Sequence, residues 1–251
     1  MARKVTLYFG SFNPIHRGHI AVAESVINSG MGDELWFVVS PQNPHKQSLG
    51  LADEAQRLLM TRLAVAESHH PQRLKVCDVE FSLPRPSYTI DTLDHLSKKY
   101  LDVEFSLLMG GDNAAKIESW KEWERLLATY KIIVYPRHGD RVDERFILLE
   151  DAPLLDISST QIREAVADNK EISGFVTPAV ASYIEAHPEL WDRVEVLRSR
   201  GKRRFAESDF GGAINDFTAI CRLTGGDEEA EQMAEMAREI LDFRYKDIYN
   251  P

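Results

Sequence analysis

Short apolar runs alternate with amphipathic stretches over roughly the first 190 residues of the chain. Residues 5–9 and 35–39 are almost wholly apolar, a pattern typical of strands that are covered on both faces. Helical periodicity at 53–64 follows Asp53, a suitable N-cap, and places Leu58, Leu59, Leu63 and Ala64 on one face. Gly30 is a suitable stop for the helix before it. Further strands are predicted at 74–79, 105–109 and 131–135, and further helices at 19–28, 89–99 and 120–129.

This alternation of strands and helices predicts an α/β fold. Strand–helix–strand units with short connections form parallel sheets with right-handed crossovers and helices on both faces. We therefore expect a Rossmann-like, doubly wound parallel sheet. In such sheets ligands bind outside the carboxyl ends of the strands, so the loops that follow the strands are the first places to look for chemistry.

The pattern changes after Asp192, where no further strand signal is found and two or three helices are expected. We predict a first domain at 1–192 and a C-terminal all-α extension at 193–251. Residues 205–217 resemble part of a tetratricopeptide-type helix pair, but repeats of that kind need several copies to stand alone. A helical hairpin packed on its own domain or on a sister subunit, giving a possible homo-oligomer, is favoured over a module that binds another partner. The basic run 198–204 and the acidic run 227–229 are expected to be solvated faces.

Composition narrows the function classes. A net charge of −10 argues against general nucleic-acid binding, although a local nest of N–H groups can still hold a small anion. No apolar run in the 251 residues is long enough to cross a bilayer, and the N-terminus lacks the features of a secretory signal. The two cysteines, Cys77 and Cys221, do not suggest a disulfide framework. We expect a cytoplasmic protein without a membrane partner.

The loop after the first predicted strand, GSFNPIHRGH at 10–19, has the residues that a triphosphate site needs. Gly10 lets backbone approach a ligand, Ser11 offers a hydroxyl, and Gly18 leaves room above a helix N-terminus that favours anions. His16 and His19 are three residues apart, so on a helical turn both face the same ligand.

A second segment, ISSTQIR at 157–163, carries related chemistry. Ser158 or Ser159 can cap a helix N-terminus that holds phosphates, and Arg163 one turn later adds positive charge. Alone, the serine pair would indicate nothing more than a cap.

The two segments together resemble the nucleotidyltransferase superfamily that is related to class I aminoacyl-tRNA synthetases. The first matches the G-x-F-x-P-x-H-x-G-H signature at all six of its specified positions. The resemblance implies an ATP site, with His16, His19, Lys46 and Arg163 as catalytic residues. The implied ATP-binding residues are Gly10, Ser11, Phe12, His16, Gly18, His19, Ile157, Ser158, Ser159 and Arg163.

Further segments resemble one family of that superfamily, the nicotinate-nucleotide adenylyltransferases. They are PQNPHK at 41–46, PSYTIDTL at 86–93, GGD at 110–112 and WKEW at 120–123. The resemblance implies a phosphate clamp at Lys46, a pyridine-carboxylate contact at Thr89, a ribose contact at Asp112 and a ring-stacking partner at Trp120. The implied acceptor-binding residues are Lys46, Tyr88, Thr89, Gly111, Asp112, Trp120 and Arg137.

Each segment also has a simpler explanation. The histidine pair, with His45, could hold zinc, although no cysteine or carboxylate lies in the same loop. Trp120 and Trp123 could be core residues of one helix, Trp123 more readily than Trp120. Asp112 could be only a helix cap, and Thr89 could simply begin a helix. Two departures from the family pattern, Ser11 and Asn13 where many members have Thr and Asp, bear on details of the site.

The resemblance implies transfer of the adenylyl group of ATP to nicotinate mononucleotide, with Mg²⁺ held by the ATP phosphates and no dedicated metal site. The alternatives are transfer to nicotinamide mononucleotide or phosphopantetheine, aminoacyl-tRNA synthesis, and nucleotide binding without catalysis. The segments around Thr89 and Trp120, which the resemblance assigns to a pyridine ring, argue against phosphopantetheine because that acceptor has no such ring. The short acidic chain, without a lysine-rich second signature, argues against a synthetase.

Overall fold

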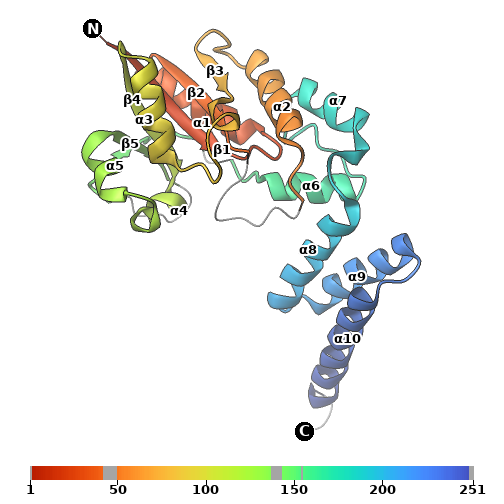
Figure 1. Cartoon of the computed structure of the whole chain (residues 1–251). Helices are drawn as coiled ribbons and strands as arrows, with labels where there is room; N and C mark the ends of the chain where they lie inside the picture. The colour runs from red at the N-terminus through yellow and green to blue at the C-terminus, as the bar shows by residue number, and fades with distance from the viewer. Residues whose placement is uncertain (1, 42–49, 137–142, 154, 249–251) are drawn as a thin grey trace. The chain divides into compact units, whose positions relative to one another are not determined.

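The computed structural model describes residues 2–41, 50–136, 143–153 and 155–248 (Figure 1). The chain divides into two compact units, one of Met1–Ile162 with Ile172–His187 and one of Arg163–Glu171 with Pro188–Pro251. The first unit contains the sheet, and the second is helical.

All strands of the described sheet are parallel, in the order β3-β2-β1-β4-β5-β6. This is the doubly wound order that the alternation of strands and helices predicted, so the fold class is confirmed. The strands are β1 (Arg3–Gly10), β2 (Glu34–Val39), β3 (Leu74–Cys77), β4 (Val103–Gly110), β5 (Lys131–Tyr135) and β6 (Ile147–Leu148).

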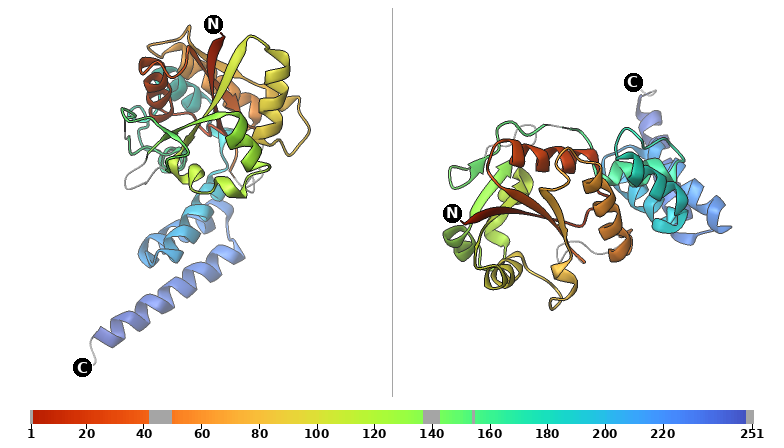
Figure 2. Two further views of the ribbon diagram at one scale, coloured as in Figure 1. Left: turned by 90° about the vertical axis from the view of Figure 1, so that its left-hand side faces the viewer. Right: turned by 90° about the horizontal axis from the view of Figure 1, so that it is seen from above.

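Helices pack on both faces of the sheet (Figure 2). Successive residues of a strand point to opposite faces. Leu7, Leu107 and Val134 belong to a core cluster that also contains apolar residues of α3 and α5. Their neighbours along the strands point to the opposite face, where α1 buries Val26 and Ile27. The helices of this unit are α1 (Arg17–Asn28), α2 (Glu54–Ala66), α3 (Thr89–Lys99), α4 (Gly111–Ala114), α5 (Trp123–Thr129), α6 (Ser159–Ala167), which continues into the second unit, and α7 (Pro178–Ala186), with 3-10 turns η1 (Val79–Phe81) and η2 (Ile117–Ser119).

Three sequence predictions about these elements are corrected. The strand expected at 74–79 ends at Cys77, because the chain turns into η1 at Val79. The helix expected at 120–129 begins at Trp123, because Glu122 before it has a left-handed conformation with φ 52°. Leu59 of α2 is 41% exposed, and the buried face of that helix includes Arg57 instead.

Capping residues fix the helix boundaries that the sequence did predict. Asp53 accepts a hydrogen bond from the Ala55 amide at 2.8 Å and so caps α2 as expected. Gly30, just beyond α1, has φ 70°, a conformation that favours glycine. No helix among the described residues is long and apolar enough to span a membrane.

The second unit contains the 3-10 turn η3 (Pro188–Leu190) and three helices, α8 (Arg193–Ala206), α9 (Phe210–Thr224) and α10 (Glu228–Ile248). A helical hairpin of α8 and α9 is closed over a small core that includes Leu197, Phe217 and Ala234. Gly201 permits this approach, because a Cβ there would lie 3.0 Å from the Phe217 ring.

The two charge runs of this unit pair with each other, so the expectation that both are merely solvated faces is wrong. Arg198 of the basic run donates to Asp227 of the acidic run at 2.6 Å. Arg200 is buried and donates to Asp216 and Asp168, and this hydrogen bonding raises the pKa of its guanidinium. Ion pairing at the start of α10 therefore holds this helix against α8.

Candidate active site

The centre of the sheet, between β1 and β4, is where the strand order reverses. Ligands of doubly wound folds bind at this point, outside the carboxyl ends of the strands. The loop that leads from β1 into α1 begins there at Gly10, and β4 ends there in Gly110 before Asp112. The two motif segments that follow β1 and β4 therefore meet at the same edge of the sheet.

His16 and His19 form a stacked pair at the start of α1. Their ring centroids are 3.6 Å apart with an interplanar angle of 26°. His16 is the N-cap residue, and its backbone N–H donates to Nδ1 of His19 at 3.2 Å. Because Nδ1 of His19 accepts, the neutral ring carries its proton on Nε2, where it can be donated to a ligand. The prediction that both histidines share one helical turn is confirmed.

The His19 ring packs against the edges of the aromatic rings of Tyr8 and Phe12. Phe12 is buried, and its ring centroid lies 5.1 Å from that of His19 and 5.4 Å from that of Phe37. The hydroxyls of Tyr8 and Tyr135 are 2.9 Å apart, which joins the carboxyl ends of β1 and β5. Since the ring of Phe12 is inside the protein, only its backbone is available to a ligand.

Two glycines of the loop are required by these rings. A Cβ at Gly10 would lie 2.8 Å from the Phe12 ring, and a Cβ at Gly18 would lie 3.0 Å from Nδ1 of His16. The sequence suggested ligand access as the reason for both glycines. The structure adds a reason that the sequence did not give, which is close packing of the loop on its own side chains.

The second motif is tied to the first. Ser158 and Gln161 cap α6 reciprocally, at 2.7 Å and 3.2 Å, so the predicted cap is confirmed. The hydroxyl of Ser159 donates to the carbonyl of Pro14 at 2.8 Å. Ile157 is partly buried beside them. The N-terminus of α6 is therefore held against the loop that carries the histidines.

Arg163 follows one turn later on α6, in the segment 163–171 that belongs to the second compact unit. It is partly buried, and this burial lowers the pKa of its guanidinium.

Two further side chains shape this loop, Asn13, which the sequence marked as a departure from the family pattern, and Arg57, which it did not single out as a site residue. Asn13 donates from Nδ2 to the Gly50 carbonyl at 2.8 Å and accepts at Oδ1 from the Ala52 amide at 3.1 Å. An amide does both at once, whereas the ionised aspartate of many family members can only accept. Arg57 is fully buried and donates to main-chain carbonyls of the same region. Its position among apolar residues of α2 gave no sequence signal beyond an interrupted pattern.

Two of the acceptor segments of the sequence analysis, 86–93 and 120–123, lie together on the α3 side of the sheet. Tyr88 and Trp120 both pack against the same core cluster. Lys121, next to Trp120, donates to Asp91 in the first turn of α3 at 2.8 Å and lies 4.9 Å above the Tyr88 ring.

Thr89 begins α3, as the simpler explanation held. Its N-cap residue Tyr88 makes no side-chain cap, so the first N–H groups of α3 do not donate to the side chain of that residue. An anion is a suitable partner for such groups.

Asp112 is exposed in the first turn of α4, whose N-cap is Gly110. The simpler explanation of Asp112 as that helix's cap is therefore wrong. A Cβ at Gly110 would lie 2.7 Å from Oδ1 of Asp112 and 3.2 Å from the ring of Tyr135. Gly110 thus lets the carboxylate fold back over the end of β4, next to the buried Gly111.

Some predicted residues lie outside the described part of the chain, namely Lys46, Arg137 and His45. Trp123 is only partly buried. Among the residues that the structure describes, no three His, Cys, Asp or Glu side chains gather as a metal site.

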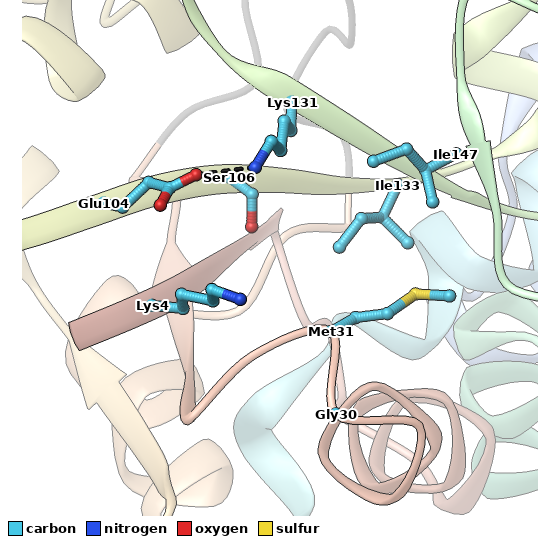
Figure 3. Close-up of a pocket in the computed structure, with 8 residues that line it drawn as sticks. All are labelled: Lys4, Gly30, Met31, Glu104, Ser106, Lys131, Ile133 and Ile147. Atoms are coloured by element: carbon cyan, nitrogen blue, oxygen red, sulfur yellow. Dashed lines mark hydrogen bonds and ion pairs between the residues drawn. The ribbon is translucent and has the colours of Figure 1, made fainter. Parts of the chain in front are cut away.

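A surface pocket lies at the opposite edge of the sheet and takes no part in this site (Figure 3). It is lined near the amino ends of the strands by Lys4, Glu104 and Lys131, of which the last two pair at 2.8 Å.

Comparison with known proteins agrees with this geometry. A family model described as cytidylyltransferase-like matches residues 7–165. A protein of Flavobacterium psychrophilum named as probable nicotinate-nucleotide adenylyltransferase is 43% identical over 188 residues, 72% of this chain and 96% of that protein. One of the same name from Bacteroides fragilis is 44% identical over 181 residues, 70% of this chain and 89% of that protein.

A solved structure shares the fold. The nicotinic acid mononucleotide adenylyltransferase of Plasmodium falciparum, complexed with NaAD, superposes with a TM-score of 0.65 at 22% identity. The match covers 75% of this chain and 98% of that one. By its match to the family model and by its relatives, the chain belongs to the nicotinate-nucleotide adenylyltransferase family of cytidylyltransferase-like proteins.

Proposed function

We propose that this enzyme joins ATP and nicotinate mononucleotide to give deamido-NAD and pyrophosphate, a step of NAD biosynthesis. A phosphate oxygen of the mononucleotide attacks the α-phosphorus of ATP, the bond from that phosphorus to the β-phosphate oxygen breaks, and pyrophosphate leaves. The observation that carries the proposal is the stacked pair His16 and His19 at the topological switch point, tied by Ser159 to the second motif.

No covalent enzyme intermediate is required, so the protein's contribution is positioning and charge neutralisation. His16 and His19 stabilise the ATP phosphates through the transition state, which suits a proton on Nε2 of His19. Lys46 and Arg163 neutralise the charge that develops on pyrophosphate. The backbone of Gly10, Ser11, Phe12 and Gly18, with Ile157, Ser158 and Ser159, lines the rest of the nucleotide site.

The acceptor occupies the α3 side of the site. The uncapped first turn of α3 at Tyr88 and Thr89 binds the pyridine carboxylate, and Trp120 stacks on the positively charged ring. Asp112, beside Gly111, accepts hydrogen bonds from the ribose, and Arg137 adds a further contact.

Adenylyltransferases of this family generally use a divalent metal ion with ATP. We propose Mg²⁺ bound as part of the substrate, coordinated by phosphate oxygens and water. The imidazoles and hydroxyls of the loop fit phosphate oxygens, which is consistent with an ion that arrives on the nucleotide.

We also propose a location, a domain division and an oligomeric state for this protein. They are a cytoplasmic location, a nucleotidyltransferase domain at 1–192 with an extension at 193–251, and a homo-oligomer formed through the C-terminal helices. The oligomer is tested by sedimentation of the full chain beside a variant in which the exposed Phe243 of α10 is replaced by serine.

The decisive experiment measures pyrophosphate release by the purified protein with ATP, Mg²⁺ and either nicotinate or nicotinamide mononucleotide. Strong preference for the acid is expected, because an uncapped helix N-terminus favours a carboxylate over an amide. Preference for the amide would overturn the assignment of the Thr89 segment. Absence of release with both would move the assignment to another acceptor or to nucleotide binding without catalysis.

A further inference from the structure

Arg57 is a buried cation that joins three segments of the nucleotide site. Its guanidinium donates to the carbonyls of Ser11 in the β1–α1 loop at 2.6 Å, Ser40 after β2 at 2.7 Å, and Pro41 at 2.9 Å. Its Nε donates to the carbonyl of Ala52 at 2.9 Å. No carboxylate pairs with it among the described residues, and burial lowers its pKa to about 10. One side chain therefore sets the position of the ATP loop relative to the end of β2.

Glu80 is a buried acid that joins the end of β2 to the acceptor segment. Its carboxylate accepts from Oγ1 of Thr92 in α3 at 2.8 Å and also from the side chain of Ser40. It is 2% exposed, and burial raises the pKa of the carboxyl group. Burying an acid of this kind costs free energy, so its retention calls for a reason beyond packing.

Ser40 connects the guanidinium of Arg57 to the carboxylate of Glu80. Its carbonyl accepts from Arg57, and its side chain donates to Glu80. A continuous chain of hydrogen bonds therefore runs from Ser11 in the ATP loop through Arg57, Ser40 and Glu80 to Thr92 in α3, half-buried at Ser11 and Ser40 and fully buried at Thr92.

We propose that Arg57 and Glu80 are positioning residues that, through Ser40, fix the ATP loop and the acceptor segment relative to each other. The inference rests on the proposed function, because it takes these segments as the two substrate sites. An in-line transfer depends on the distance between the attacking oxygen and the phosphorus, so a small shift of one segment lowers the rate even when both substrates bind. A chain of hydrogen bonds that is largely shielded from water is suited to this purpose, since it allows few alternative arrangements.

The sharpest test is Ser40→Ala, which removes the hydroxyl bond to Glu80 and keeps the carbonyl that Arg57 holds. With both substrates saturating, we expect kcat to fall about ten-fold. In the free protein, we expect the amides of 88–92 to exchange with deuterium faster. Thr92→Val, which breaks the chain at its other end, should give the same pair of effects.

The matched control is Thr6→Val. Thr6 is also fully buried, and its hydroxyl lies 3.0 Å from that of Ser106, but it is not part of the chain of bonds. We expect wild-type kcat and wild-type exchange at 88–92 for this variant.

Two results would overturn the proposal. One is wild-type kcat and exchange at 88–92 in Ser40→Ala, and the other is an equal loss in Thr6→Val. The proposed function and the positioning role fail separately. If the wild-type protein transfers no adenylyl group, the proposed function is contradicted. Deuterium exchange at amides 88–92 still decides whether the two segments are linked. A variant that unfolds is identified by its thermal midpoint, and Thr92→Val, which keeps the shape of the side chain, then decides.

Discussion

The imidazole of His19 is oriented from several sides before any substrate arrives. It stacks on His16, meets the edges of Tyr8 and Phe12, and accepts a backbone hydrogen bond at Nδ1. A side chain held in this way loses little conformational freedom on binding a phosphate. This preorganisation is what electrostatic catalysis requires.

Replacing His16 with alanine should therefore lower turnover while the fold stays intact. We expect kcat to fall by about 10² to 10³, the usual loss for one donor that acts on a developing charge. The measurement is pyrophosphate release beside a thermal melt. His69→Ala is the control, because His69 is exposed and pairs only with Glu24 among the contacts described for it. Near-normal turnover in folded His16→Ala would refute the role of this residue.

Gly110 offers a steric test at the same scale. An added methyl group would lie 2.7 Å from Oδ1 of Asp112, so Gly110→Ala should displace that carboxylate. We expect KM for the mononucleotide to rise about ten-fold and KM for ATP to change little, consistent with an overpacking cost of about 1–3 kcal/mol. Gly174→Ala is the matched control, since its methyl group would meet nothing within 4 Å. Equal kinetic parameters in the two variants would contradict the placement of Asp112.

Among the elements, α6 carries one bond that joins the two motifs. Ser159→Ala removes the hydrogen bond to Pro14. A hydrogen bond within a protein contributes about 1 kcal/mol, so KM for ATP should rise roughly five-fold. Ser82→Ala, which loses a local bond to Val79 on the surface, should leave this KM unchanged. An unchanged KM in Ser159→Ala would mean that the motifs are aligned by other contacts.

Elements with a clear period could be predicted closely from the sequence. The helix 89–99 and the strand 131–135 are found at the predicted residues, because each is bounded by residues that end its pattern. The strand β6 has two residues and is too short to show a period. The start of α5 was predicted too early, because a hydrophobic pattern gives no sign of the left-handed conformation of Glu122.

The site was predicted where residues form local motifs and missed where they act across the fold. His16 and His19 are neighbours in the sequence, so their spacing was informative. Arg57 and Glu80 serve segments that lie far from them along the chain, and each looks like an ordinary polar position in its own element. Their partners are mostly main-chain carbonyls or hydroxyls, which no single-sequence pattern reveals.

At the scale of the whole molecule, the second unit depends on ion pairs that respond to pH. Hydrogen bonds from Arg200 lower the pKa of Asp168 to about 2, below the ordinary 3.8 of an aspartate. The folded-state pKa is depressed, so the contribution of Asp168 to stability is present above pH 3.8 and is lost as the pH falls through 2.

Asp168→Asn should therefore destabilise the protein at neutral pH and not in strong acid. We expect a loss of about 1–2 kcal/mol at pH 7 after allowance for solvent screening, shrinking to nothing near pH 2. Denaturant unfolding over a pH series measures it. Asp78→Asn is the control, because the Arg62–Asp78 pair is more than half exposed and contributes little. A loss independent of pH would show that packing, not charge, is the cause.

Helix α6 begins in one compact unit and ends in the other, and this division orders events during synthesis. A growing chain can complete its sheet at Leu148 and join Ser159 to Pro14 soon afterwards. Glu164 and Asp168 receive their partners only when Arg203 and Arg200 leave the ribosome. A product that ends before these arginines would lack the two ion pairs that Glu164 and Asp168 make, so the second half of α6 gains its charged partners last.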